Sequence, residues 1–289
     1  MQLQDLIGNV QRFELLSAKL TQQKLAGLFA STFKGRGLAI DHLRKYEAGD
    51  NVRDIDWNVT ARYREPFTKV FTQERERLVW VLLDVSSSMR NDSPGKSKYD
   101  VQLELGAALA YAALAGNDRV GVIFYSDQVE QVIHPGRGKM HFWNIAHTMV
   151  GLTPSRQATS IVTALRFLAD YTTTRASAIF LLSDFICSDY AQVVPVLAQQ
   201  HELFALRVYD EREGTVPRLG WVRLRDAESG VVRWVNTFSA AFRQQFVSHY
   251  QQVAHRFEET FSATPARSRS LSTGGRHFEE LIGFLHAGQ

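Results

Sequence analysis

From residue 78 onwards the chain alternates short apolar runs with amphipathic segments. The apolar runs at 78–83, 120–124, 178–182 and 203–208 each have the length of a strand and carry apolar side chains at consecutive positions. Runs that are apolar on both faces indicate strands in the middle of a sheet that is covered on both sides. A further strand is expected at 129–133.

Helical spacing of apolar residues characterises the segments between these strands. We expect helices at 98–115, 141–150, 159–170, 190–200, 239–261 and 278–285, and a loop at 262–275. Strands that alternate with helices form right-handed βαβ units, which place helices on both faces of a mainly parallel sheet. The predicted fold class is therefore α/β and Rossmann-like, with a mainly parallel central sheet.

The first 77 residues have a different pattern, with an expected helix at 11–32, a charge-dense stretch, and a strand-like alternation at 67–73. We expect a smaller companion domain beside the sheet domain. The expected division is 1–77 for the N-terminal part of the companion, 78–209 for the sheet domain, and 210–289 for a hairpin (221–225 and 231–235) that joins the companion, together with C-terminal helices that complete the sheet domain.

Composition narrows the class of protein. Of 289 residues, 45% are hydrophobic and 22% are charged, which is enough apolar material for a core and excludes disorder over most of the chain. The lone cysteine, Cys187, cannot form a disulfide within the chain, so we expect a reducing compartment and a small buried side chain. The net charge of +3 gives no argument for nucleic acid as a partner.

Neither a transmembrane segment nor a secretory signal is expected. No apolar run approaches the roughly 20 residues that span a bilayer. The first residues, 1–5, lack the charged and then apolar pattern of a signal peptide. The predicted location is the cytoplasm.

Five oxygen-bearing side chains follow predicted strands or open a predicted helix. They are Asp84, Ser86, Ser88, Thr159 and Asp184. Open parallel sheets bind ligands at the carboxyl ends of their strands, near the point where the strand order reverses. Alternate residues of a tight loop can point the same way, so the D-x-S-x-S segment at 84–88 can direct its three polar side chains to one point. Ser160, next to Thr159, is an alternative hydroxyl donor.

This donor set favours a hard divalent cation. It contains carboxylates and hydroxyls but no imidazole or thiolate, which suits Mg²⁺, or Mn²⁺ or Ca²⁺, better than Zn²⁺ or Cu²⁺. Two carboxylates would neutralise the ion, and the hydroxyls would add no charge. The cation would then accept one more anionic ligand, such as an acidic residue of a partner protein, without any bond being made or broken.

Other interpretations of these residues are open. Asp84 and Asp184 could cap helices while the serines satisfy turn backbone. Asp84 could instead be the nucleophile of a Mg²⁺-dependent phosphohydrolase, although such enzymes of the haloacid dehalogenase type carry D-x-D where this chain has Ser86. A serine hydrolase is disfavoured because no G-x-S-x-G segment occurs.

The five residues resemble the metal-ion-dependent adhesion site (MIDAS) of the von Willebrand factor A fold. There the first loop reads D-x-S-x-S, a second loop supplies Thr and a third supplies Asp, which by resemblance map to Asp84, Ser86, Ser88, Thr159 and Asp184. The resemblance implies a non-catalytic, metal-dependent protein-interaction module.

A second resemblance covers most of the chain. Residues 33–37, 44–57 and 60–62 are similar to the signature of a bacterial family, domain-of-unknown-function family number fifty-eight, which couples this stretch to a von Willebrand A domain. Relatives are often encoded beside MoxR-type AAA+ ATPases, which implies such an ATPase as partner. From the residues themselves, we expect Arg and Asp of 53–62 to form ion pairs that hold the companion domain on the sheet domain.

Overall fold

The computed structural model describes residues 1–21, 39–47, 50–72, 77–90, 95–154, 158–171, 177–187, 189–225 and 230–287. The chain divides into two compact units. The larger consists of Met1–Thr32 and Leu78–Gln289, and the smaller of Phe33–Arg77.

A six-stranded sheet forms the centre of the larger unit. Its strands are β3 (Leu78–Asp84), β4 (Arg119–Tyr125), β5 (Val129–Gly136), β6 (Ala178–Ser183), β7 (Glu202–Tyr209) and β10 (Arg267–Ser272). Their order is β10-β7-β6-β3-β4-β5, and only the β4–β5 pair is antiparallel. From β3 the chain builds outwards to β5 and then returns to the other side of β3, which is the doubly wound order. The predicted α/β fold with a mainly parallel sheet is confirmed, and β3 and β6 flank the point of reversal.

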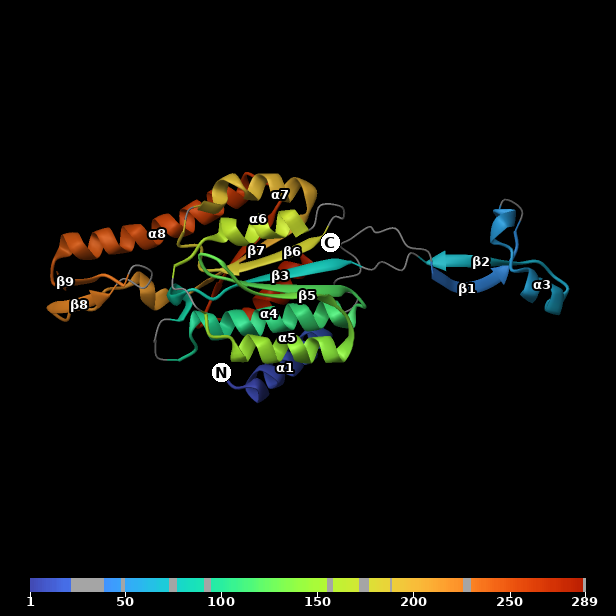
Figure 1. The fold of residues 1–289 in the computed structure, drawn as a ribbon, viewed down its shortest axis with the longest axis horizontal. Helices are drawn as coiled ribbons and strands as arrows, with labels where there is room; N and C mark the ends of the chain where they lie inside the picture. Colours follow the sequence, from blue (N-terminus) through green and yellow to red (C-terminus); the bar gives the residue numbers. More distant parts are fainter. Residues whose placement is uncertain are drawn as a thin grey trace. The chain divides into compact units, whose positions relative to one another are not determined.

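Helices cover both faces of this sheet. They are α1 (Leu3–Thr21), α4 (Lys98–Ala115), α5 (Gly138–Gly151), α6 (Ile161–Tyr171), α7 (Val194–Gln200), α8 (Ala240–Ser262) and α9 (His277–His286), with short 3₁₀ turns η2 (Ser87–Arg90), η3 (Asp189–Gln192) and η4 (Glu211–Gly214). Figure 1 shows α4 and α5 on one side of the sheet, with α1 beyond them, and α6 and α7 on the other side.

The core begins at β3, whose residues 79–84 are all fully buried. Trp80 and Leu82 belong to a cluster with Ile179 and Leu181 of β6 and with apolar residues of α6 and α7. Successive strand residues point to opposite faces, so the continuous apolar run serves both helix layers at once.

Helix α1 belongs to the larger unit, so the predicted boundary at residue 77 is wrong for the first helix. Leu6, Val10 and Phe13 are buried, and the Phe13 ring lies 5.4 Å from that of Phe278 in α9. These residues recur at helical spacing and pack on α4, α5 and α9. The helix begins at Leu3 instead of residue 11, and the predicted part from 22 to 32 lies outside the described residues.

Strand β10 replaces part of the loop predicted at 262–275. It pairs in parallel with β7 at the edge of the sheet. Its sequence, RSRSLS, is mostly polar, and only Leu271 and Ser272 are buried. An edge strand does not need apolar residues on both faces, which is why the apolar pattern did not predict it.

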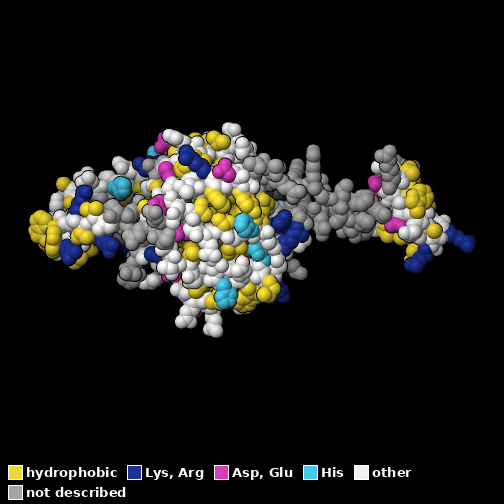
Figure 2. All heavy atoms as spheres, in the orientation of Figure 1, with side chains coloured by type: hydrophobic (Ala, Val, Ile, Leu, Met, Phe, Trp, Pro, Cys, Tyr) yellow, Lys and Arg dark blue, Asp and Glu magenta, His cyan; other side chains and the backbone are white. Residues whose placement is uncertain are grey.

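The predicted hairpin forms as β8 (Trp221–Arg225) and β9 (Val232–Asn236), which pair antiparallel. It lies in the larger unit, so its predicted attachment to the companion domain is wrong. Trp221 and Trp234 are 68% and 64% exposed. Figure 2 shows hydrophobic side chains together with Lys and Arg over this end of the unit.

The smaller unit contains an antiparallel pair, β1 (Ala39–Lys45) and β2 (Phe67–Thr72), with η1 (Val52–Asp54) and α3 (Trp57–Tyr63) between them. Asp56 caps α3 by accepting hydrogen bonds from the backbone N–H groups of Asn58 and Val59. Arg44 donates to Asp50 over 2.7 Å. The Glu47 backbone N–H and then Arg44 hold the pKa of Asp50 below its ordinary value.

Of the charged residues of the signature, Asp56 caps a helix, and Arg44 and Asp50 form a local ion pair. The side chain of Arg53 lies outside the described residues. Within the described ranges, no helix has both the length and the apolar character needed to cross a membrane.

Candidate functional site

The carboxyl end of β3 brings the D-x-S-x-S side chains together. Asp84 is the last residue of the strand, and its Oδ1 accepts a hydrogen bond of 2.9 Å from the Ser86 backbone N–H. The hydroxyl oxygens of Ser86 and Ser88 lie 3.1 Å apart. All three residues are buried. The convergence predicted from the spacing is therefore present at the start of η2.

Asp184 follows the neighbouring strand β6 and lies at the same edge of the sheet. The residue before it, Ser183, donates a hydrogen bond of 2.6 Å to Asp84 Oδ2. Burial, and then the charge of Asp184, raise the pKa of Asp84 to about 7. Two acidic groups from different strands thus interact in a region shielded from water, as expected at a point of strand reversal.

Thr159 lies in the loop before α6, and the next residue attaches that loop to the same edge. The Ser160 backbone N–H donates to the Ser126 carbonyl over 2.9 Å. Ser126 follows Tyr125, which pairs with Asp84 in the β3–β4 register. The Thr159 hydroxyl oxygen is buried and has no hydrogen-bond partner within the part of the chain that the structure describes. The Ser160 hydroxyl, in contrast, donates to Asp189 over 2.7 Å.

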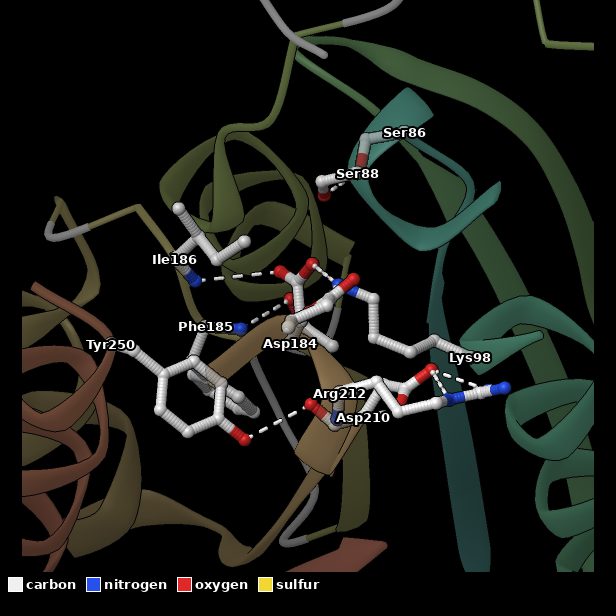
Figure 3. Close-up of polar contacts among 11 residues, drawn as sticks. Ser86, Ser88, Lys98, Asp184, Phe185, Ile186, Asp210, Arg212 and Tyr250 are labelled. Carbon is white, nitrogen blue, oxygen red and sulfur yellow. Dashed lines mark hydrogen bonds and ion pairs between the residues drawn. The ribbon is translucent and has the colours of Figure 1, made fainter. Parts of the chain in front are cut away.

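Lys98 is a central residue of this region that the sequence analysis missed. It opens α4, and its Nζ donates to Asp184 Oδ2 and to Glu213 Oε2, at 2.9 Å each (Figure 3). The side chains of Lys98 and Asp184 are both nearly inaccessible to solvent. Burial lowers the pKa of Lys98, but the two carboxylates outweigh it, so the pKa lies above its ordinary value.

The position of Lys98 follows from the start of α4. Ser97 forms a capping box with Asp100, which sets the first turn of the helix and directs residue 98 towards the strand ends. The only sequence signal was a lysine at the first position of a predicted helix. Asp184 lies 86 residues further along the chain, and Glu213 lies 115, so no local pattern links the three.

Lys98 changes the expected charge balance of the site. Asp184 is neutralised by an ammonium group, so the expectation that two carboxylates would neutralise a cation is not met by this arrangement. Among the described residues, no cationic side chain forms an ion pair with Asp84, and no group of three or more His, Cys, Asp or Glu side chains is placed to hold a metal ion. A cation here would depend on Asp84 and on hydroxyls.

The remaining donors fit a hard cation. Asp84 is a buried carboxylate, Ser86 and Ser88 present adjacent hydroxyls, and Thr159 has a buried hydroxyl oxygen without a partner among the described residues. Buried polar atoms are normally hydrogen-bonded, so an unused hydroxyl in the loop between α5 and α6 is a feature that a bound ligand would account for. Mg²⁺ prefers a coordination shell with one or two carboxylates, in which hydroxyl or water oxygens fill the other positions.

Several solved structures are similar in fold. BatB from Bacteroides thetaiotaomicron has a TM-score of 0.46 and 15% identity, over 73% of this chain and 98% of that one. The von Willebrand A domain of SpRpn10 has a TM-score of 0.43 and 12% identity, over 72% and 94% of the two chains. Proximal thread matrix protein 1 from the mussel byssus, solved with a zinc-occupied MIDAS motif, has a TM-score of 0.40 and 13% identity, over 74% and 47%.

Relatives by sequence include the uncharacterized protein Rv1480 of Mycobacterium tuberculosis and the uncharacterized protein Mb1516 of Mycobacterium bovis. Each is 27% identical over 273 residues, which is 91% of this chain and 85% of the relative. The sequence profile described as "Protein of unknown function DUF58" matches residues 42–256, which include the signature residues 44–57 and 60–62 and the candidate site. The chain therefore belongs to the DUF58 family.

Proposed function

We propose that this protein is a non-catalytic interaction module that binds a protein partner through a divalent cation, Mg²⁺ in the first place. Asp84, Ser86, Ser88 and Thr159 would hold the ion. Asp184, which pairs with Lys98, would not bind the ion directly. It would set the charge and the hydrogen bonds around Asp84. The metal would supply a Lewis-acidic position that an acidic residue of the partner can occupy.

The observation that carries this proposal is the buried Thr159 hydroxyl, which has no partner among the described residues and lies in a loop attached beside Asp84. This loop is far from the D-x-S-x-S segment in sequence. A purely structural turn would be expected to use this hydroxyl for backbone capping, as Ser160 uses its own side chain on Asp189.

The geometry gives less support to the phosphohydrolase alternative. Both carboxylate oxygens of Asp84 accept hydrogen bonds, one from Ser183 and one from the Ser86 backbone. A nucleophilic aspartate needs an ionised oxygen directed at the substrate, whereas Asp84 is fully buried and its pKa is raised to about 7.

The ion can be tested with Mn²⁺ as the probe, by calorimetric titration of the full chain above pH 7, where Asp84 is ionised. We expect Asp84→Asn and Thr159→Val each to weaken binding about tenfold or more, because the first removes the negative charge of the carboxylate and the second removes a hydroxyl ligand. Ser160→Ala is the matched control, since its hydroxyl is engaged with Asp189. Unchanged affinity in Thr159→Val would contradict the proposal.

The partner that the family resemblance implies is a MoxR-type AAA+ ATPase. We expect such an ATPase from the same cell to co-purify with the wild-type chain in Mg²⁺, and to be lost in EDTA and with Asp84→Asn. If the ATPase still co-purifies in EDTA and with Asp84→Asn, it binds this chain without the help of the metal. Hydrolysis of 4-nitrophenyl phosphate that disappears in Asp84→Asn would favour the enzyme instead.

A further inference from the structure

A buried arginine without an acidic partner lies beside the candidate site. Arg207, on β7, is 4% exposed and pairs in register with Ser183 of β6, the residue that precedes Asp184. Its guanidinium carbon lies 5.0 Å from the ring centre of Tyr209 and 5.9 Å from that of Tyr250. Within the described part of the chain, its buried Nε has no hydrogen-bond partner and Arg207 forms no ion pair.

Arg207 lines a cavity of about 260 Å³ between the strand ends and α8. The cavity is also lined by Ser88, Asp184, Glu213, Phe246, Tyr250 and Val253. Ser88 and Asp184 connect it to the candidate metal site, whereas Phe246 and Val253 of α8 give it an apolar wall.

An unpaired buried guanidinium is costly. Removing a charge from water without a counter-ion costs several kcal/mol in a protein interior. The two tyrosine rings offset part of this cost through cation–π contact with the guanidinium. A ring face, however, cannot accept hydrogen bonds from all the N–H groups of the guanidinium. A guanidinium held in this way is suited to an anion that enters the cavity from outside.

Two acidic residues that line the same cavity limit the charge of that anion. Asp184 and Glu213 share the single ammonium of Lys98, so this trio has a net charge of −1. A phosphate dianion would be repelled more strongly than a singly charged group. The apolar wall favours a ligand whose charge is attached to an aliphatic or aromatic body.

We propose that this cavity, which we call the Arg207 pocket, binds a single carboxylate carried on an apolar group, with Arg207 as the residue that pairs with it. The carboxylate can belong to a polypeptide or to a small free acid. This inference goes beyond the metal-dependent contact, because Arg207 is not one of the proposed metal ligands. Only its proximity to the metal site links the two.

The probe is 3-phenylpropanoate, titrated into ¹⁵N-labelled full-length protein in EDTA and followed by amide chemical shifts. Its neutral analogue, 3-phenylpropanamide, is the control ligand. We expect the carboxylate to bind about tenfold or more tightly than the amide, as for a charge-assisted hydrogen bond to a buried group. The shifts should concentrate on β7, α8 and the residues around Asp184.

A short peptide with a C-terminal phenylalanine, free or amidated at its carboxyl end, distinguishes the two sources. Tighter binding of the free peptide than of 3-phenylpropanoate supports a polypeptide ligand. Binding of the small acid alone supports a free acid. Both outcomes support the Arg207 pocket, whereas equal binding of acid and amide would overturn it.

Arg207→Met tests the residue itself, and thermal stability shows whether its role is only structural. Because the variant removes an unpaired buried charge, we expect an unchanged or higher Tm together with loss of carboxylate binding. Arg267→Met is the matched control. Arg267 also stacks on two rings, those of Phe204 and Phe284, but it donates to the Phe284 carbonyl, so its loss should lower the Tm and leave probe binding unchanged.

A drop in Tm for Arg207→Met with carboxylate binding retained would overturn the proposal and assign a structural role. Because the titration is done in EDTA, its outcome does not depend on the metal. Repeating the titration with Asp84→Asn separates the two hypotheses. This variant lacks a proposed metal ligand but should still bind the probe, so failure of the metal proposal would leave the Arg207 pocket unaffected.

Discussion

At the scale of single residues, Lys98 changes the electrostatics of the candidate site more than any predicted ligand. A buried ammonium beside Asp184 and Glu213 supplies inside the fold part of the positive charge that a metal would bring. Under the proposed function, Asp84 is then the carboxylate that is left to bind the divalent ion. This arrangement leads to two predictions about charge.

Lys98→Met should destabilise the protein strongly in EDTA. Removing one partner of a buried ion pair costs roughly 3–5 kcal/mol, because the other charge is left uncompensated. Mn²⁺ should reduce the deficit, since the ion restores positive charge near Asp184. Urea denaturation at pH 8, with and without Mn²⁺, measures both effects.

Arg276→Met is the control for this change. Arg276 lies 3.3 Å from Glu279, and the two side chains are 83% and 39% exposed, so the expected cost is below about 1 kcal/mol. Equal losses of unfolding free energy in the two variants would show that burial of the Lys98 ion pair does not increase its contribution to stability.

Asp84 predicts a pH dependence with a definite sign. Burial and Asp184 raise its pKa from 3.8 in the unfolded chain to about 7, so the folded protein binds this proton more tightly. The resulting stability is present below about pH 4 and is lost as the pH rises to about 7. In EDTA, the free energy of unfolding of wild type relative to Asp84→Asn should fall across this window and stay constant above it. A difference that rises with pH would mean that the carboxylate is stabilised as an anion.

At the scale of elements, close packing of neighbouring strands explains a glycine in a buried strand. A Cβ placed on Gly121 of β4 would lie 2.5 Å from the Trp80 ring of β3. Trp80 is fully buried, so the ring has little room to move. The apolar pattern predicted both strands, but the need for glycine at 121 arises only when they pair.

Gly121→Ala should therefore destabilise the sheet by about 1–3 kcal/mol through overpacking. Gly283→Ala in α9 is the control, because no atom lies within 4 Å of its added Cβ. There the substitution should stabilise by about 0.5–1 kcal/mol, the difference in helix propensity. Chemical denaturation of both variants gives the comparison, and a neutral effect at Gly121 would show that Trp80 can shift.

Elements also differ in how well their sequences predict them. The central strands β3 and β6 were evident because burial on both faces requires uninterrupted apolar residues. The edge strand β10 was missed because its side chains are mostly polar and its pairing with β7 is what makes it a strand.

At the scale of the whole molecule, the N-terminal helix is part of the larger unit although the smaller unit separates it from the sheet in sequence. Phe13 is fully buried, with its ring against Phe278 near the other end of the chain. The larger unit is therefore discontinuous, and its stability should depend on residues before the smaller unit.

Phe13→Ala should lower the free energy of unfolding by about 3–5 kcal/mol, as for other large-to-small changes in a core. Hydrogen exchange should then accelerate in α4 and α9, the helices that α1 contacts. Leu15→Ala, at a side chain 65% exposed, should have little effect. Normal protection of α4 and α9 in Phe13→Ala would show that α1 is dispensable for the larger unit.

The sequence by itself determined the alternation of strands and helices and the segments that carry Asp84, Thr159 and Asp184. These properties are local, because periodicity and strand-end position are written in neighbouring residues. Only the tertiary structure decided that α1 joins the larger unit, that Asp184 shares the ammonium group of Lys98 with Glu213, and that Arg207 is buried without an ion pair among the described residues. Each of these depends on side chains far apart in the chain, whose charges and surfaces acquire their energies only when folding excludes water between them.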